Sequence, residues 1–227
     1  MISIDRGQWY ESVFAKVLSQ QDIIRQPITN YTELSNKEKD QLRQTQVFED
    51  EIVQVLGVHE GFSLVRKYEA TLGWMLSKNL KASECKSFEI PKYPMRPASE
   101  FLSSWKGTIY EFGGLSKQGI DCSGFTQLYY LNVIGSVLPK NSKDQRKLGI
   151  QSSFNNLKDH DLIFCRPLSD LSSHHVALFF SNQLWHSRRN GGVVCQRIED
   201  FIIEFQVEDV RTLRGAESDT KPLKLKN

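Results

Sequence analysis

The stretch GTIYEFGGLSKQGIDCSG, residues 107–124, decides the fold of this chain. It holds five glycines in eighteen residues, and an apolar segment with helical spacing follows it. Glycines this dense indicate tight turns that bring the backbone close to another group. Asp121 and Ser123 are residue types that favour helix N-termini, so Cys122 is predicted to lie at the start of a helix. There the helix dipole and unpaired amides favour an anion, which predicts a lowered pKa for the thiol and a thiolate nucleophile.

The other cysteines have a simpler interpretation. The chain contains four cysteines and no C-x-x-C pair, which predicts free thiols rather than disulfides in a chain without an export signal. Cys165 and Cys195 each end an apolar run of strand length, so they are expected to be small buried hydrophobic residues. Cys85 lies in irregular sequence. Cys122 is therefore the candidate nucleophile.

A cysteine nucleophile requires a histidine base and a group that orients this base. A two-residue loop at 181–182 would pair the flanking strands so that His175 faces Arg188 and His186 lies one diagonal step from His175. Diagonal neighbours on a sheet are roughly 7–8 Å apart, within reach of two imidazoles. His174 would point to the opposite face. The sequence predicts His175 as the base, His186 as the orienting group and His174 as a bystander.

Two alternatives concern the same histidines. A zinc site would use the histidines with Cys165, but His174 and His175 point to opposite faces of a regular strand, and no C-x-x-C or H-E-x-x-H spacing is present. We therefore predict no metal. The second alternative, that His186 is a hydrogen-bonded strand histidine without a catalytic role, is disfavoured only by the independent Cys122 motif.

The chain divides into four parts by pattern. Apolar residues at helical spacing predict an N-terminal helical region over 1–81, with a capping box at Ser35 and Glu38. Three prolines predict a linker over 82–97. Helix and strand patterns then predict a catalytic domain over 98–214, and a polar, lysine-rich stretch predicts a disordered tail over 215–227.

Composition limits the possible functions. The 227 residues are 39% hydrophobic and 25% charged, with a formal net charge of +2, which is typical of a globular chain. Nucleic-acid-binding proteins usually carry a clustered excess of Lys and Arg, and this sequence has none. No stretch reaches the roughly 18 apolar residues of a membrane helix. Charged residues interrupt the first twenty positions, so no signal peptide is recognised. We expect a cytoplasmic protein, or one secreted by a route that the sequence does not reveal.

The order and spacing of six motifs resemble the NlpC/P60 family of papain-like, bacterial cell-wall cysteine peptidases. The family pattern is a G-x-x-Y-x-W-G-G turn, D-C-S-G, L-P-[RK]-x-S-x-x-Q, G-D-L, H-V-[GA] and I-H-[AS]. Three positions depart from it: Phe112 replaces the tryptophan, His160 the glycine of G-D-L, and Ala177 the glycine of H-V-G. None is a proposed catalytic residue. The motifs fall at residues 107–114, 121–124, 138–145, 161–162, 175–177 and 185–187.

The resemblance implies an α+β, papain-like fold in which the helix bearing the nucleophile packs on an antiparallel sheet. It implies a thiol protease with a catalytic triad of Cys122, His175 and His186, without a cofactor. The backbone amide of Cys122 would stabilise the oxyanion. The expected substrate is a peptidoglycan stem peptide or muropeptide, cut between D-glutamate and a diamino acid. The oligomeric state stays open.

The resemblance also suggests substrate-binding residues. Tyr110 would lie in the active site and hold the substrate or the tetrahedral intermediate. Asp121 and Ser123 would flank the cleft and contact the free amine of a short stem peptide. Arg188 and Arg189, just after His186, would recognise carboxylates of the substrate.

Two other functions are compatible with the sequence. The same chemistry serves amidases, deamidases or acyltransferases that act on another substrate, such as a host protein or a lipid. A binding module that works through its N-terminal region is the non-enzymatic alternative, and the presence of Cys122, His175 and His186 argues against it.

Overall fold

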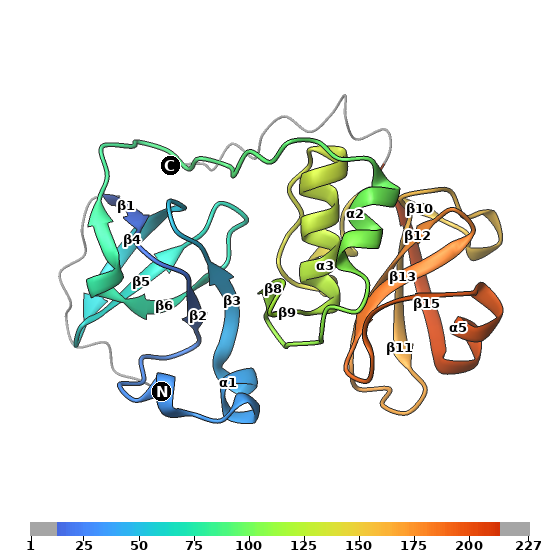
Figure 1. Cartoon of the computed structure of the whole chain (residues 1–227), viewed down its shortest axis with the longest axis horizontal. Helices are drawn as coiled ribbons and strands as arrows, with labels where there is room; N and C mark the ends of the chain where they lie inside the picture. Colours follow the sequence, from blue (N-terminus) through green and yellow to red (C-terminus); the bar gives the residue numbers. More distant parts are fainter. Residues whose placement is uncertain (1–12, 214–227) are drawn as a thin grey trace. The chain divides into compact units, whose positions relative to one another are not determined.

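The computed structural model of the chain describes residues 13–213 (Figure 1). It divides them into two compact units. The first contains residues 13–94 and 111–116, and the second contains residues 95–110 and 117–213. Within residues 13–213, none of the helices has the length and apolar character needed to span a bilayer.

The first unit is a seven-stranded antiparallel sheet with the strand order β3-β2-β6-β5-β4-β1-β7. One short helix, α1, connects β2 to β3, and alternate strand residues form a core of small and β-branched side chains such as Val17, Ile23, Val53 and Val65. The elements are β1 (Val13–Val17), β2 (Gln21–Ile24), α1 (Asn36–Leu42), β3 (Arg43–Val47), β4 (Ile52–His59), β5 (Phe62–Arg66), β6 (Leu72–Leu76) and β7 (Leu80–Ala82), with 3-10 turns at Tyr31–Glu33 and Ser77–Asn79.

The predicted N-terminal helical region is therefore wrong for the described residues. Within the region predicted as helical, residues 43–76 fold mainly as the strands β3 to β6. The first four residues of β4 are all buried, so they show no alternation, and a bulge between Val55 and Gly57 breaks the period of two. Both features hide a strand from pattern analysis. One local prediction is confirmed, since Ser35 and Glu38 form a capping box that begins α1.

The second unit contains a six-stranded antiparallel sheet with the order β10-β15-β11-β12-β13-β14. Residues 83–97 form no helix or strand, and the predicted tail from 215 lies outside the described residues. The elements are α2 (Ala98–Trp105), β9 (Gly119–Ile120), α3 (Cys122–Tyr129) with a π-helical extension (Tyr130–Ile134), α4 (Ser142–Gln145), β10 (Ile150–Ser152), a 3-10 turn (Phe154–Asn156), β11 (Leu162–Pro167), β12 (His175–Phe180), β13 (Gln183–Arg188), β14 (Gly192–Gln196), α5 (Ile198–Glu204) and β15 (Phe205–Thr212). The strand β8 (Leu115–Ser116) belongs to the segment of the first unit.

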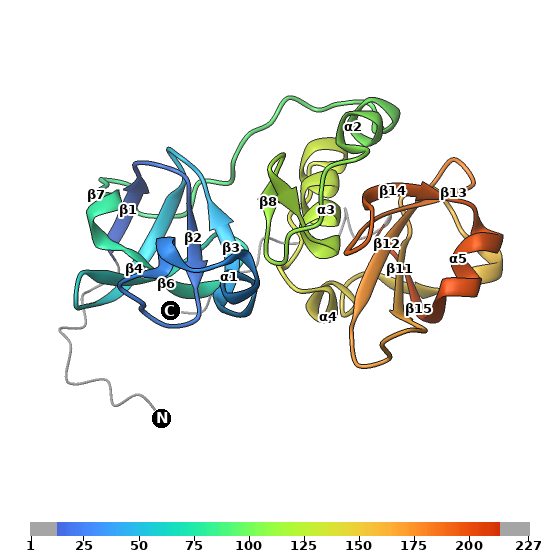
Figure 2. The same ribbon diagram turned by 60° about the horizontal axis from the view of Figure 1, so that its bottom comes forward.

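Helices cover this sheet. Helix α3 packs against β12 and β13, and α5 packs against β15 and β13 (Figure 2). On one face, Ala177 and Phe179 of β12 join Phe201 of α5 and Phe205 in a buried cluster. The intervening strand residues, such as Val176, are buried as well, so both faces of the strand are covered. The predicted α+β class, with the cysteine helix on an antiparallel sheet, is confirmed.

The hairpin of β12 and β13 has the predicted register. Phe180 pairs with Gln183, and Leu178 pairs with Trp185. The loop residues Ser181 and Asn182 have φ values of 52° and 59°, which are those of a type I′ turn. This turn matches the twist of the strands and therefore fixes which residues lie opposite each other.

Candidate active site

Cys122 is the first residue of α3. The carboxylate of Asp121 caps the helix by accepting a hydrogen bond from the backbone amide of Gly124 at 2.5 Å. The cysteine side chain is 7% exposed. The predicted position of Cys122 at a helix start is thus confirmed.

The predicted lowering of the Cys122 pKa is wrong in this structure. Burial raises the pKa of the Cys122 thiol to about 12, and the neighbouring carboxylate of Asp121 adds to the rise. Hydrogen bonds from the backbone amides of Val176 and Ser123, and the charge of Lys140, oppose the rise without overcoming it. Desolvation outweighs the helix dipole here, so the resting group is a neutral thiol.

His175 and His186 contact each other as the hairpin predicts. The Nε2 atom of His175 lies 2.8 Å from Nδ1 of His186, and the ring centroids are 5.0 Å apart. His175 also stacks on Phe205. Burial lowers the pKa of His175 well below its ordinary value and lowers the pKa of His186 to about 4. Both imidazoles are therefore neutral near pH 7.

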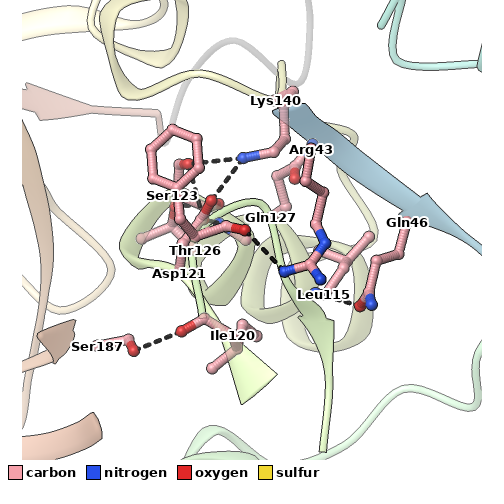
Figure 3. Close-up of polar contacts among 12 residues, drawn as sticks. Arg43, Gln46, Leu115, Ile120, Asp121, Ser123, Thr126, Gln127, Lys140 and Ser187 are labelled. Atoms are coloured by element: carbon pink, nitrogen blue, oxygen red, sulfur yellow. Dashed lines mark hydrogen bonds and ion pairs between the residues drawn. The ribbon is translucent and has the colours of Figure 1, made fainter. Parts of the chain in front are cut away.

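Two contacts bring the cysteine helix to this histidine pair. The backbone amide of Val176, the residue after His175, donates a hydrogen bond to the sulfur of Cys122. Ser187, the residue after His186, donates its hydroxyl proton to the carbonyl of Ile120 at 2.7 Å (Figure 3). Ser187 thus connects β13 to the residues just before the cysteine helix.

Gln196 is a third partner that sequence reasoning missed. Its Oε1 atom lies 3.0 Å from Nε2 of His186. Gln196 ends β14 and pairs with Leu184, so it lies one diagonal step from His186 across the β13–β14 hairpin. The diagonal rule that connects His175 with His186 would have found Gln196 as well.

His174 lies outside the histidine pair and is half-buried. It precedes β12 and lines a cavity together with His175, Lys143 and Arg146. Burial, followed by the charge of Lys143, lowers its pKa. Among the residues from 13 to 213, His, Cys, Asp and Glu side chains form no group of three or more that could hold a metal ion.

Asp121 and Ser123 form a buried polar cluster with Lys140 (Figure 3). The ammonium of Lys140 lies 2.7 Å from Oδ2 of Asp121, and the hydroxyl of Ser123 donates to Oδ1 of Asp121 at 2.9 Å. Lys140 belongs to the L-P-K motif, and no function was predicted for it from the sequence. The ammonium of Lys140 contacts one carboxylate oxygen of Asp121, the residue that was expected to contact the free amine of the substrate. The contact of Asp121 with a substrate amine stays a prediction.

Tyr110 lies beside the site on the glycine-rich turn. It forms a parallel bridge with Ile120, and the guanidinium of Arg189 lies 5.6 Å from its ring centre. Two backbone hydrogen bonds of 2.8 Å join Gly107 and Thr108 to Val193 of β14. These contacts place Tyr110 next to the start of the cysteine helix, while its role toward a substrate stays a prediction.

Arg188 is already paired. Its guanidinium lies 2.6 Å from a carboxylate oxygen of Glu204. It lines a surface hollow together with Gln183, Cys195 and Gln196. A substrate carboxylate would have to compete with Glu204 for this side chain.

The fold and the site define an α+β domain in which a cysteine at a helix start lies beside a pair of histidines on an antiparallel sheet. Residues 107–211 match the model of the NlpC/P60 family, in agreement with the resemblance of the six sequence motifs.

Curated relatives align with the same part of the chain. A probable endopeptidase NlpC homolog of Haemophilus influenzae is 35% identical over 99 residues, which are 43% of this chain and 51% of the relative. The murein DD-endopeptidase MepS/murein LD-carboxypeptidase of Escherichia coli K12 is 34% identical over 99 residues, which are 43% of this chain and 52% of the relative. The gamma-D-glutamyl-L-lysine dipeptidyl-peptidase of Bacillus cereus is 33% identical over 101 residues, or 42% of this chain and 30% of the relative. The matched region spans about half of the first two relatives.

One solved structure resembles most of the chain. It is an NlpC/P60 family protein from Bacillus cereus ATCC 10987, with a TM-score of 0.68 and 19% sequence identity. The match covers 88% of this chain and 99% of that chain. The similarity of fold is therefore not restricted to residues 107–211.

Proposed function

We propose that this protein is a cysteine endopeptidase that hydrolyses the bond between D-glutamate and a diamino acid in peptidoglycan stem peptides or muropeptides. The observation that carries the proposal is the 2.8 Å contact between His175 and His186, beside a thiol that accepts a hydrogen bond from Val176. A relative named as a murein DD-endopeptidase and murein LD-carboxypeptidase, and another named as a gamma-D-glutamyl-L-lysine dipeptidyl-peptidase, support the substrate class.

The neutral resting state determines the first chemical step. His175 takes the proton of the Cys122 thiol as the sulfur attacks the carbonyl carbon of the scissile amide. The backbone amide of Cys122 donates to the oxyanion of the tetrahedral intermediate. His175 then returns the proton to the leaving amine, the C–N bond breaks and a thioester remains. Water activated by His175 hydrolyses the thioester and restores the thiol.

A cationic cavity beside the base supports a substrate with carboxylates. The cavity has a volume of about 370 Å³ and lies next to His175. Stem peptides carry free carboxylates, which a cation favours. Arg146, Lys147 and Arg211 already pair with acidic residues, whereas Lys143 forms no ion pair among the described residues. We propose Lys143 in this cavity, rather than Arg188 alone, as the place where a substrate carboxylate binds. Its charged and polar lining residues are Ser142, Lys143, Arg146, Lys147, His174, His175, Glu208 and Arg211.

A panel of defined peptides tests the proposal. The purified protein is incubated with a D-glutamyl–diaminopimelate tripeptide, its lysine analogue and a D-alanyl–diaminopimelate cross-linked dimer, and the products are identified by mass spectrometry. We expect cleavage after D-glutamate in the first two substrates, and none with the Cys122→Ala variant. Cleavage restricted to the cross-link would overturn the proposed bond. If the folded protein cuts none of the three, the proposed substrate class is wrong.

A further inference from the structure

Gln196 bridges the histidine pair and a surface carboxylate. Its Oε1 atom lies 3.0 Å from Nε2 of His186, and its Nε2 atom lies 2.7 Å from Oε1 of Glu204. The other carboxylate oxygen of Glu204 is ion-paired with Arg188 at 2.6 Å. A carboxylate only accepts hydrogen bonds, so the amide NH₂ of Gln196 must face Glu204. The amide oxygen of Gln196 must then face His186.

This orientation determines where the proton of His186 lies. An amide oxygen only accepts, so Nε2 of His186 must carry a hydrogen. The ring is neutral and holds a single N–H, which leaves a lone pair on Nδ1. That lone pair accepts the hydrogen of Nε2 on His175, 2.8 Å away. The Nδ1 atom of His175 is consequently the nitrogen that keeps a lone pair and can take the thiol proton.

We propose that Gln196, oriented by Glu204, is a positioning residue that fixes the tautomers of His186 and His175 so that the base carries its lone pair on Nδ1. The inference deepens the proposed peptidase site. It concerns a protonation pattern that exists without substrate, so it is testable separately from the proposed function.

Burial makes the contact with Gln196 necessary. The side chain of His186 is 0% exposed, so no solvent replaces a missing acceptor at Nε2. A buried N–H without a partner is costly, and moving the proton to Nδ1 removes that cost. His186 would then donate to Nε2 of His175, and the hydrogen of His175 would move to Nδ1. The base would have no lone pair to offer to the thiol, which is the defect of a wrong tautomer in a catalytic triad.

The direct test is nuclear magnetic resonance of the protein labelled with ¹⁵N-histidine at neutral pH. Two-bond ¹H–¹⁵N spectra distinguish protonated from unprotonated ring nitrogens. We expect the Nε2–H tautomer for both His175 and His186 in the unmodified chain. An Nδ1–H tautomer on either ring would overturn the inference whatever the activity.

The variant Gln196→Met removes the acceptor and keeps the length of the side chain. We expect an Nδ1–H signal on His186 and a kcat about 10- to 100-fold lower, with KM little changed, because an unpaired buried donor biases the tautomers by about that factor. The matched control is Gln183→Met, which changes a glutamine on the neighbouring strand that bonds to Cys195 and to neither imidazole. Unchanged tautomers in Gln196→Met, with folding verified by circular dichroism, would overturn the inference.

A swap of the two polar residues provides a rescue. In Gln196→Glu, two carboxylates face each other, and in Glu204→Gln, the new amide meets donors from both Gln196 and Arg188. The double variant restores every bond, since Glu at 196 accepts from His186 and from the amide at 204, whose oxygen accepts from Arg188. We expect each single variant to lose activity and the double variant to regain it together with the Nε2–H tautomers. Failure of the double variant to regain them would contradict the proposed role. If the tautomers are as described but no stem peptide is cut, the proposed function fails and the positioning role stands.

Discussion

The thiol of Cys122 is subject to opposing influences at one residue. The helix start and the amide of Val176 favour a thiolate, while burial and the carboxylate of Asp121 favour the thiol, and the second pair dominates. A neutral thiol is a weak nucleophile until a base removes its proton. The reactivity of the site therefore depends on the adjacent histidines.

Cys122→Ala is expected to reduce hydrolysis to background and leave folding intact, because a small apolar side chain replaces the thiol without adding volume. Cys165→Ala is the matched control, since Cys165 is also buried and pairs with His175 across β11 and β12. It should keep most of the activity. Steady-state hydrolysis of the D-glutamyl–diaminopimelate tripeptide measures both variants. If Cys165→Ala is as inactive as Cys122→Ala while folded, the choice of nucleophile is wrong.

His160 shows why the family motif has glycine at its position. Its φ is 77°, a left-handed conformation that side chains with a Cβ rarely adopt. Tyr129 and Tyr130 compensate, since the hydroxyl of Tyr129 lies 2.6 Å from Nδ1 of His160 and that of Tyr130 bonds to the His160 carbonyl. From the motif alone, His160 was only a departure from the glycine of G-D-L.

A pair of variants separates strain from hydrogen bonding at His160. His160→Ala keeps the strained backbone and removes the partner of Tyr129, so the free energy of unfolding should fall by about 1–3 kcal/mol. His160→Gly loses the same bond but releases strain of about 1 kcal/mol, so it should be the milder change. Urea denaturation measures both. A glycine variant less stable than the alanine variant would show that strain is not stored there.

The β12–β13 hairpin is the element on which the site depends. The contact of His175 with His186 requires that the loop at 181–182 contain two residues and that no bulge interrupt the hairpin. His174 precedes β12 and has no bond to either ring among the described contacts.

Replacing each histidine by alanine tests this arrangement. His175→Ala should lower turnover by roughly 10²–10⁴-fold or more, the usual contribution of a general base. His186→Ala should cost less, because His186 orients the base without exchanging protons with substrate. His174→Ala should cost little. An inactive His174→Ala beside a nearly normal His175→Ala would contradict the assignment.

The buried imidazoles also make stability depend on pH. The pKa of His186 is lowered from 6.5 to about 4 by burial, so protonation favours the unfolded chain. The stabilisation is complete above about pH 6.5 and is lost as the pH falls toward 4. Over that range it amounts to something on the order of 3 kcal/mol. Urea denaturation from pH 7 to pH 4 should show this decrease, with a smaller slope in His186→Gln. Equal slopes in the two proteins would contradict the assigned cause.

The elements differ in how far the sequence predicts them. The two-residue type I′ loop fixes which residues of β12 and β13 lie opposite each other. The positions of His175 and His186 can therefore be predicted from the local sequence. In the first unit, bulges between Ile23 and Ile24 and within β4 disrupt the alternation of buried and exposed residues along the strands. Apolar residues then recur at spacings of three and four, which is the pattern of a helix. The pKa of Cys122 was mispredicted for a different reason, since burial depends on the whole fold and has no local signal.

At the scale of the whole molecule, Arg43 secures a segment that is distant in sequence. It is 4% exposed and lies 2.8 Å from carboxylate oxygens of both Asp22 and Glu111. It also donates to the carbonyl of Phe112 at 3.1 Å, and Gln46 accepts from the amide of Leu115 at 2.8 Å. Residues 111–116 are thereby fixed in the first unit, although they connect Tyr110 to the cysteine helix.

Arg43→Met should destabilise the first unit by about 3–5 kcal/mol, because it leaves two largely buried carboxylates without their cation. The control Lys16→Met removes an exposed ion pair with Asp50 and should cost less than about 1 kcal/mol. Thermal denaturation followed by circular dichroism compares the two. Similar midpoints for both variants would mean that the buried pairs contribute no more than a surface pair.

The course of residues 111–116 has a consequence for how the protein can be divided. Because this segment belongs to the first unit and both of its flanks belong to the second, no single cut yields two self-sufficient polypeptides. A chain severed within residues 83–97 would give an amino-terminal piece that lacks one segment of its own unit. The carboxyl-terminal piece would carry that segment. Such a pair is suited to fragment complementation, in which association of the two pieces returns residues 111–116 to the first unit.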